Sequence, residues 1–186
     1  MTSKSKDQPK PRWPAVKSAI SGVDRAALLE LIRDLYGLTE SNQHFVDARL
    51  GLRKDPLAHY KEVIAECMYP DVFRKQPIQI SKAKKTISEY RKAARDARGE
   101  IELMVHFVEC GNRFTLDYGD IDEGFYAALV RMYAKAIKAI KDLPDPEQPA
   151  FRDRLGDIAK SADGIGWGYG DGLCDAFFSV FPEARG

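Results

Sequence analysis

Apolar residues recur every three or four positions along most of the chain, which is the spacing of one face of an α-helix. The segment 24–36 is an example, and its apolar stripe consists of Leu28, Leu31, Ile32 and Leu35. The alternation of apolar and polar residues that is typical of a β-strand is confined to residues 78–80. The pattern therefore predicts an all-α fold.

Capping residues, glycines and prolines divide this pattern into separate helices. Asp24 and Asp55 are typical N-cap residues, whereas Gly37 and Pro70 are typical stops. Pro14 can open one short helix, and the longer segments expected to be helical are 24–36, 40–50, 56–69, 81–98, 100–118, 120–142, 147–162 and 167–181. Short links between them predict an antiparallel helical array or bundle of about seven to eight helices, of which a short solenoid-like stack is one form.

The length of 186 residues suits one ordinary domain. Residues 1–13 are rich in lysine, serine and proline and have no apolar period, so we expect a disordered basic arm there. Residues 14–183 are expected to form a single helical domain. Within it, Gly111 interrupts an otherwise helical stripe, which predicts a close approach between two helices.

Membrane and secretion signals are missing from the pattern. Apolar runs are too short for a transmembrane helix, and the polar N-terminal residues do not resemble a signal peptide. The three cysteines, Cys67, Cys110 and Cys174, are scattered and form no metal-binding pair. We therefore expect free thiols, a cytoplasmic protein and no membrane partner.

The net charge of +1 conceals a strongly basic segment. Residues 74–98 hold nine basic residues against Glu89 and Asp96, and most of the cations in the helix expected over 81–98 share the face opposite its apolar stripe. The candidate anion-binding residues on it are Lys84, Arg91, Arg95 and Arg98. A nucleic-acid-associated protein is one interpretation of this face, and an ordinary solvated helix face is the other.

Glycine occupies five of the nine positions from 164 to 172. The segment lacks the Gly-Lys-Ser/Thr of a phosphate loop and follows a predicted helix rather than a strand, so nucleotide binding is not indicated. One interpretation is a flexible binding corner; the other is tight packing, with Gly168 and Gly172 admitting a neighbouring helix and Trp167 and Tyr169 filling gaps.

Carboxylates gather before and after this glycine-rich segment. Asp120, with Glu123 three residues later, is expected to cap the helix 120–142, and the acidic run around it suggests a hard-cation site as a further alternative. Glu102 and His106 lie one helical turn apart and are expected to form a solvated pair on the polar face. No nucleophile with a base can be identified, so we expect no catalytic residue, no bound metal and no cofactor.

Four stretches resemble one bacterial domain-of-unknown-function family of small all-helical proteins. They are the runs 24–36, 81–90, 114–126 and 161–168, and the resemblance covers residues from about 15 to 181. Its most specific strings are Tyr-Gly-Asp-Ile-Asp-Glu at 118–123 and Gly-Ile-Gly-Trp-Gly at 164–168. The family has no assigned activity, and the resemblance implies that both strings belong to one domain.

We expect from these observations a non-enzymatic protein-interaction module with a groove near the glycine-rich corner. The candidate groove residues are Asp117, Asp120, Asp122, Trp167, Tyr169 and Asp171. The alternatives are a nucleic-acid-associated protein using the basic helix 81–98, or a metal-dependent enzyme using the aspartate cluster. A protein is the expected partner, and the sequence leaves its identity and the oligomeric state open.

Overall fold

The structure, a computed structural model, describes residues 12–182. Within this range it contains nine α-helices, one short 3-10 helix and no strand, which confirms the all-α array with one or two helices more than expected. The helices are α1 Trp13–Ile20, α2 Arg25–Leu38, α3 Glu40–Leu50, α4 Ala58–Met68, α5 Ile80–Ala94, α6 Ala97–Tyr118, α7 Glu123–Ile140, α8 Gln148–Ser161 and α9 Tyr169–Val180, with the 3-10 turn η1 over Asp145–Glu147.

Contacts group the chain into two units, divided between Val46 and Asp47 within α3. The single helical domain expected over 14–183 therefore stays a prediction, and the units are described separately. The disordered arm expected over 1–13 lies mostly outside the described residues. Its last residue, Trp13, is the first residue of α1, since Pro14 occupies the favourable first turn.

The first unit contains α1, α2 and the start of α3. Asp24 caps α2 as expected, because its Oδ1 accepts a hydrogen bond of 2.9 Å from the Ala27 amide. The helix continues through Gly37, where a stop was expected, and ends at Leu38. No residue of α1 or α2 is buried. The regular apolar stripe of α2 is therefore not covered within its own unit.

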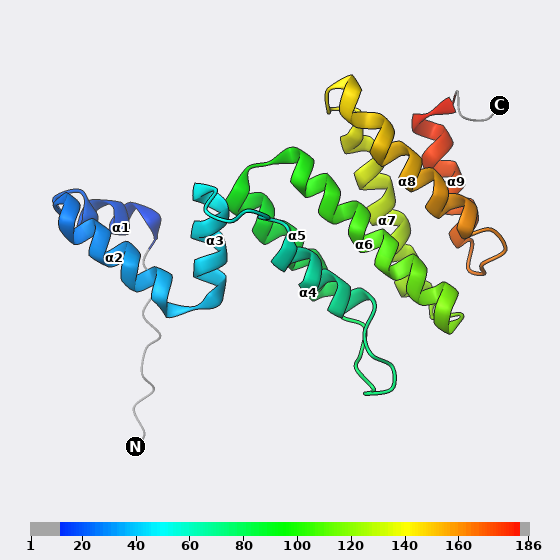
Figure 1. The fold of residues 1–186 in the computed structure, drawn as a ribbon, viewed down its shortest axis with the longest axis horizontal. Helices are drawn as coiled ribbons and strands as arrows, with labels where there is room; N and C mark the ends of the chain where they lie inside the picture. Colours follow the sequence, from blue (N-terminus) through cyan, green and yellow to red (C-terminus); the bar gives the residue numbers. More distant parts are fainter. Residues whose placement is uncertain (1–11, 183–186) are drawn as a thin grey trace, which may run out of the picture. The chain divides into compact units, whose positions relative to one another are not determined.

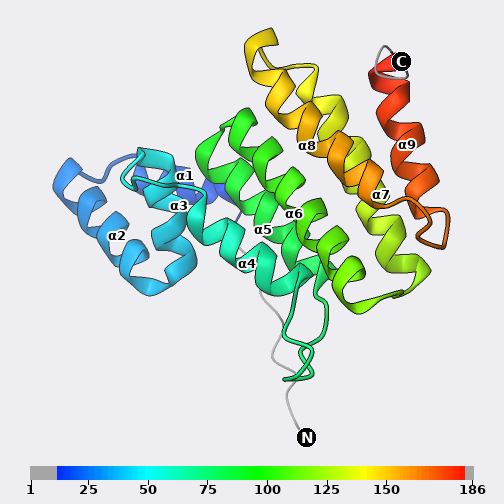
Figure 2. The same cartoon turned by 45° about the vertical axis from the view of Figure 1, so that its right-hand side comes forward.

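The second unit stacks three helix hairpins, α4–α5, α6–α7 and α8–α9, whose successive helices run in opposite directions (Figures 1 and 2). Helices α4, α6 and α8 are neighbours in one layer, and α7 packs on α9 in the other. The solenoid-like form of the predicted array therefore describes this unit. Its core lies between the layers, where large side chains such as Phe107, Leu129, Tyr133 and Tyr169 are fully buried.

Gly111 marks a close contact between α6 and α7, as its position in the stripe predicts. A Cβ atom on Gly111 would lie 2.5 Å from Cδ2 of the fully buried Leu129. The missing side chain therefore lets the Leu129 side chain lie directly against the α6 backbone, so α6 and α7 approach closely at this point.

The prediction of one basic helix over 81–98 is wrong at its C-terminal end, because two helices meet there. Helix α5 ends at Ala94, Arg95 adopts the left-handed conformation (φ 55°), and Asp96 caps α6 by accepting a 3.0 Å bond from the Gly99 amide. Asp96 also accepts a 2.7 Å hydrogen bond from the hydroxyl of Tyr90. Gly99 is consequently not a stop but a buried first-turn residue over which Tyr90 lies.

Within the described range, no helix combines the length and the apolar composition needed to cross a membrane.

Replacing Arg95 by glycine is expected to raise the free energy of unfolding by about 1 kcal/mol, because glycine enters the left-handed region without a Cβ clash. Lys85→Gly is the matched control, since it removes the same charge from the interior of α5 and is expected to lower stability by about 1 kcal/mol. Chemical denaturation measures both. Equal destabilisation by the two variants would contradict the corner at Arg95.

Candidate functional site

The glycine-rich corner joins α8 to α9 and brings two of the predicted groove residues together. Trp167 donates a 2.7 Å hydrogen bond from Nε1 to Oδ2 of Asp120, and its ring remains 58% exposed. Hydrogen bonds from Tyr126 and Trp167 lower the pKa of Asp120. Trp167 thus does not fill an internal gap. Its hydrogen bond to Asp120 joins the α6–α7 connection to the α8–α9 connection.

Tyr169 and the glycines beside it have packing roles. Tyr169 is fully buried and donates a 3.1 Å hydrogen bond to Oδ1 of Asn112, while its ring lies 5.0 Å from that of Tyr126. Gly172 makes the expected close approach between helices, since a Cβ on it would lie 3.2 Å from Cγ2 of Val130 on α7. Gly170 makes a second one, because a Cβ there would lie 2.5 Å from the carbonyl oxygen of Ala162 at the end of α8. Gly168, also expected to make such an approach, instead caps α9 in the left-handed conformation with open space around it.

The remaining aspartates of the predicted groove have separate roles. Asp117 accepts a 2.6 Å bond from the hydroxyl of Tyr69, which raises the pKa of that tyrosine to about 12. Asp122, rather than Asp120, is the N-cap of α7, because its Oδ1 accepts a 2.8 Å bond from the Phe125 amide. Asp171 is exposed in the first turn of α9.

These placements bear on the hard-cation alternative. Among the residues that the structure describes, no group of three or more His, Cys, Asp or Glu side chains is arranged to hold a metal ion. Capping and hydrogen bonding account for Asp117, Asp120 and Asp122 individually. A common groove lined by all six predicted residues stays a prediction, since only Asp120 and Trp167 are bonded to each other.

A concave surface lies between α8 and α9, and Asp163, just before the glycine-rich corner, is one of its lining residues. This α8–α9 groove has a volume of about 730 Å³. Its floor consists of Gly156, Ala159, Cys174, Phe177 and Phe178. Its rim carries Arg152, Asp153, Asp157, Lys160 and Asp163. An apolar floor with a charged rim is the arrangement of a binding groove for an amphipathic segment.

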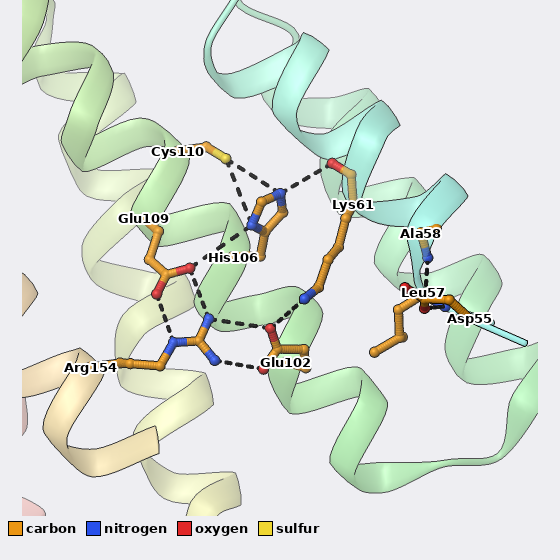
Figure 3. A network of polar contacts seen from close by, with 9 residues as sticks. All are labelled: Asp55, Leu57, Ala58, Lys61, Glu102, His106, Glu109, Cys110 and Arg154. Atoms are coloured by element: carbon orange, nitrogen blue, oxygen red, sulfur yellow. Dashed lines mark hydrogen bonds and ion pairs between the residues drawn. The ribbon is translucent and has the colours of Figure 1, made fainter. Parts of the chain in front are cut away.

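A polar network crosses the layer formed by α4, α6 and α8 (Figure 3). Arg154 of α8 donates to both carboxylate oxygens of Glu109, at 2.7 and 2.8 Å, and to both of Glu102, at 2.6 and 3.3 Å. Lys61 of α4 completes the network with a 2.6 Å bond to Glu102. Three helices are therefore tied by charge-assisted, largely bidentate bonds.

The electrostatics of Glu102 follow from this geometry. Burial alone raises the pKa of its carboxyl, but the hydrogen bonds from Arg154 and Lys61 outweigh burial and lower the pKa from 4.5 to about 2. The side chain is only 14% exposed, so solvent screens these bonds little.

His106 and Cys110 lie beside the network but do not form a reactive pair. His106 was expected on the solvated face, yet it is partly buried and its Nε2 lies 3.2 Å from the Lys61 carbonyl oxygen. Burial lowers the pKa of His106 and raises that of Cys110 to about 12. The Sγ to Nε2 distance is 3.5 Å, but both groups are neutral near pH 7 and no thiolate forms.

The predicted anion-binding residues separate into two groups. Lys84 and Arg91 line a cavity between α5 and α7. Arg98 belongs to α6 and pairs with Glu147 at 3.1 Å, and Arg95 lies in the corner between α5 and α6. The continuous basic face expected over 81–98 is therefore broken at Arg95.

Sequence reasoning missed several residues that shape these surfaces. In the groove they are Gly156, Cys174, Phe177 and Phe178, and in the cavity they are Ser88, Glu100, Arg131 and Lys135. Arg131 and Lys135 lie one turn apart on α7, and this spacing is a signal that the sequence contains. The three cysteines are free, as expected.

Comparisons with models of protein families, with curated proteins and with solved structures found no match. The resemblance to a bacterial domain-of-unknown-function family consequently stays a prediction.

Lowering the pH from 6 to 2 is expected to destabilise the wild-type protein by about 2 to 3 kcal/mol more than a Glu102→Gln variant. The folded-state pKa of Glu102 is depressed, so its contribution is complete above pH 4.5 and is lost as the pH falls toward 2. Unfolding free energies measured across this range give the difference. Parallel pH profiles of the two proteins would show that Glu102 is not held by Arg154 and Lys61.

Gly170→Ala is expected to lower the free energy of unfolding by about 1 to 3 kcal/mol, because the added Cβ meets a backbone carbonyl that cannot rotate away. Gly156→Ala is the control. Its Cβ would lie 3.5 Å from Phe177, an ordinary contact, so helix propensity should raise stability by about 0.5 to 1 kcal/mol. Thermal melts of both variants test the packing role of the corner, and a neutral Gly170→Ala result would refute it.

Proposed function

We propose that the protein is a cytoplasmic, non-enzymatic interaction module that binds an amphipathic helix of a partner protein in the α8–α9 groove. The observation that carries the proposal is the groove itself, about 730 Å³ in volume, with its aromatic floor and charged rim. Asp163, which precedes the glycine-rich corner, lines the groove, but none of the six residues predicted for a groove does. The proposal therefore places the interaction surface on the α8–α9 hairpin beside the corner rather than at the predicted residues.

The walls of the groove favour a helix as the occupant. Both walls are α-helices, whose backbone groups are bonded internally, so a strand would find no edge to extend. Apolar side chains spaced one turn apart on a partner helix can instead reach Phe177 and Phe178 on the floor. We expect two or three large apolar anchors in the partner segment.

The charges on the rim favour a partner helix of opposite charge. Three of the rim's five charged side chains are acidic, which favours a partner helix with flanking basic residues. The ion pairs on the rim, Arg152 with Asp153 at 3.6 Å and Lys160 with Asp157 at 3.8 Å, each join neighbouring residues of α8 and are solvent-exposed. Exposed pairs contribute little, so a partner can replace them at low cost.

The chemistry of the buried polar groups supports a binding rather than a catalytic role. Burial shifts the pKa of Cys110 upward and that of His106 downward, opposite to the shifts that activate a thiol nucleophile. The strongest polar network joins helices to one another and has its charges matched internally.

Phe178→Asp is expected to weaken partner binding, because it places an unpaired carboxylate on the apolar floor. Tagged protein is incubated with nuclease-treated lysate, and a peptide from each captured protein is titrated by fluorescence anisotropy. We expect at least about a tenfold loss of affinity with Phe178→Asp.

Ser179→Asp is the matched control, since it adds the same charge to the neighbouring, exposed position of α9. It is expected to bind as the wild type does, and both variants are checked for an unchanged melting curve. Captured peptides whose affinity is the same for both variants, or capture that no variant changes, would reject the α8–α9 groove as the interaction surface.

A further inference from the structure

We infer that the cavity between α5 and α7, here called the α5–α7 cleft, is a binding site for phosphate groups. Four cations from two helices line it: Lys84 and Arg91 from α5, and Arg131 and Lys135 from α7. Its volume is about 280 Å³, and Ser88 adds a hydroxyl donor to its wall. The site uses none of the residues of the α8–α9 groove, so it is independent of the proposed function.

The charges in the cleft are not balanced by the protein. Glu100 is its single acidic residue, and it pairs with Lys135 at 3.1 Å and with Arg91 at 3.7 Å. Among the described residues, no carboxylate lies within ion-pair distance of Lys84 or Arg131. The lining therefore carries an excess of three positive charges, which suits a ligand group with two or more negative charges.

The surroundings of Lys84 disfavour its positive charge. Burial and then the positive charge of Arg131 lower the pKa of the Lys84 ammonium group. Because α5 and α7 both pack on α6, the two like charges are held near each other without an ion-pair partner of their own. An anion between them removes the repulsion, so binding restores a favourable interaction that the free protein lacks.

Phosphate fits these donors better than a carboxylate does. Its oxygens point in several directions and can accept at once from donors that converge from two helices. Two arginine guanidinium groups and the Ser88 hydroxyl supply directional donors, and the lysines supply point charges. A planar carboxylate would satisfy one arginine and leave the opposite wall unpaired.

A second cavity extends the cleft and indicates a ligand larger than a single phosphate. It has a volume of about 270 Å³ and shares Arg91, Glu100 and Lys135 with the first. Its remaining lining is mostly apolar, from Ile101, Met104, Ala139 and Leu143 among others. The combined shape suits a phosphate group attached to a less polar moiety, as in a nucleotide or along a nucleic-acid backbone.

The test is calorimetric titration of the full chain at low salt with three probes: pyrophosphate, ATP, and a short single-stranded oligonucleotide. Arg131→Gln and Lys84→Gln are each expected to weaken binding at least about tenfold, because each removes a charge-assisted contact. Lys138→Gln, an exposed cation of α7 outside the cleft, is the matched control and is expected to change the dissociation constant less than about twofold.

The melting temperature of each variant without ligand shows whether weakened binding results from a loss of folding or from a change in the site. Arg131→Gln relieves the repulsion on Lys84, so it is expected to leave the melting temperature unchanged or to raise it, and weakened binding then reflects the site. ATP bound more tightly than the oligonucleotide identifies a nucleotide as the source of the phosphate. The reverse order, with a dependence on salt of about three counterions, identifies a nucleic-acid backbone.

Both orders support the site when Arg131→Gln and Lys84→Gln weaken binding selectively. Absence of binding by all three probes would overturn the inference. An equal loss of affinity in Lys138→Gln would also overturn it, because binding would then follow net charge rather than the cleft.

Discussion

The arrangement of the second unit depends most on the ion pairs that Arg154 makes with Glu102 and Glu109. The Arg154 guanidinium group bonds both Glu102 and Glu109 of α6, and Lys61 of α4 also bonds Oε1 of Glu102, so one connected set of charges joins α4, α6 and α8. Removing one member would leave the others partly buried and unmatched, which costs far more than an exposed ion pair contributes. The network therefore fixes the register of the three hairpins along one layer.

Both candidate binding surfaces follow from this register. The α8–α9 groove belongs to the last hairpin of the second unit, and no further hairpin of that unit covers it. Stacked hairpins bury their apolar faces against neighbours, so a terminal pair offers an apolar groove to another molecule. The α5–α7 cleft arises instead between the first two hairpins, where two cationic helix faces lie opposite each other across Glu100.

Local sequence signals predicted the helices well and their ends less well. Periodicity placed α3 at residues 40–50, and the Asp24 cap and the Gly111 contact were also correct, because each depends on neighbours a few residues away or on a missing side chain. The break at Arg95 was not predicted. It depends on Tyr90 lying over Gly99 and bonding Asp96, a tertiary contact that overrides the helical propensity of the segment.

The sequence predicted those site residues that share one helix, but not the residues that a second helix contributes. Lys84 and Arg91 were recognisable on α5, whereas Arg131 and Lys135 line the cleft only because α5 and α7 both pack on α6, which no spacing within one segment encodes. The same holds for Phe177, whose role depends on Gly156 across the groove. Because the cleft lies on α5 and α7 and the groove on α8 and α9, the two surfaces share no lining residue, so a phosphate ligand and a partner helix would not compete for the same side chains.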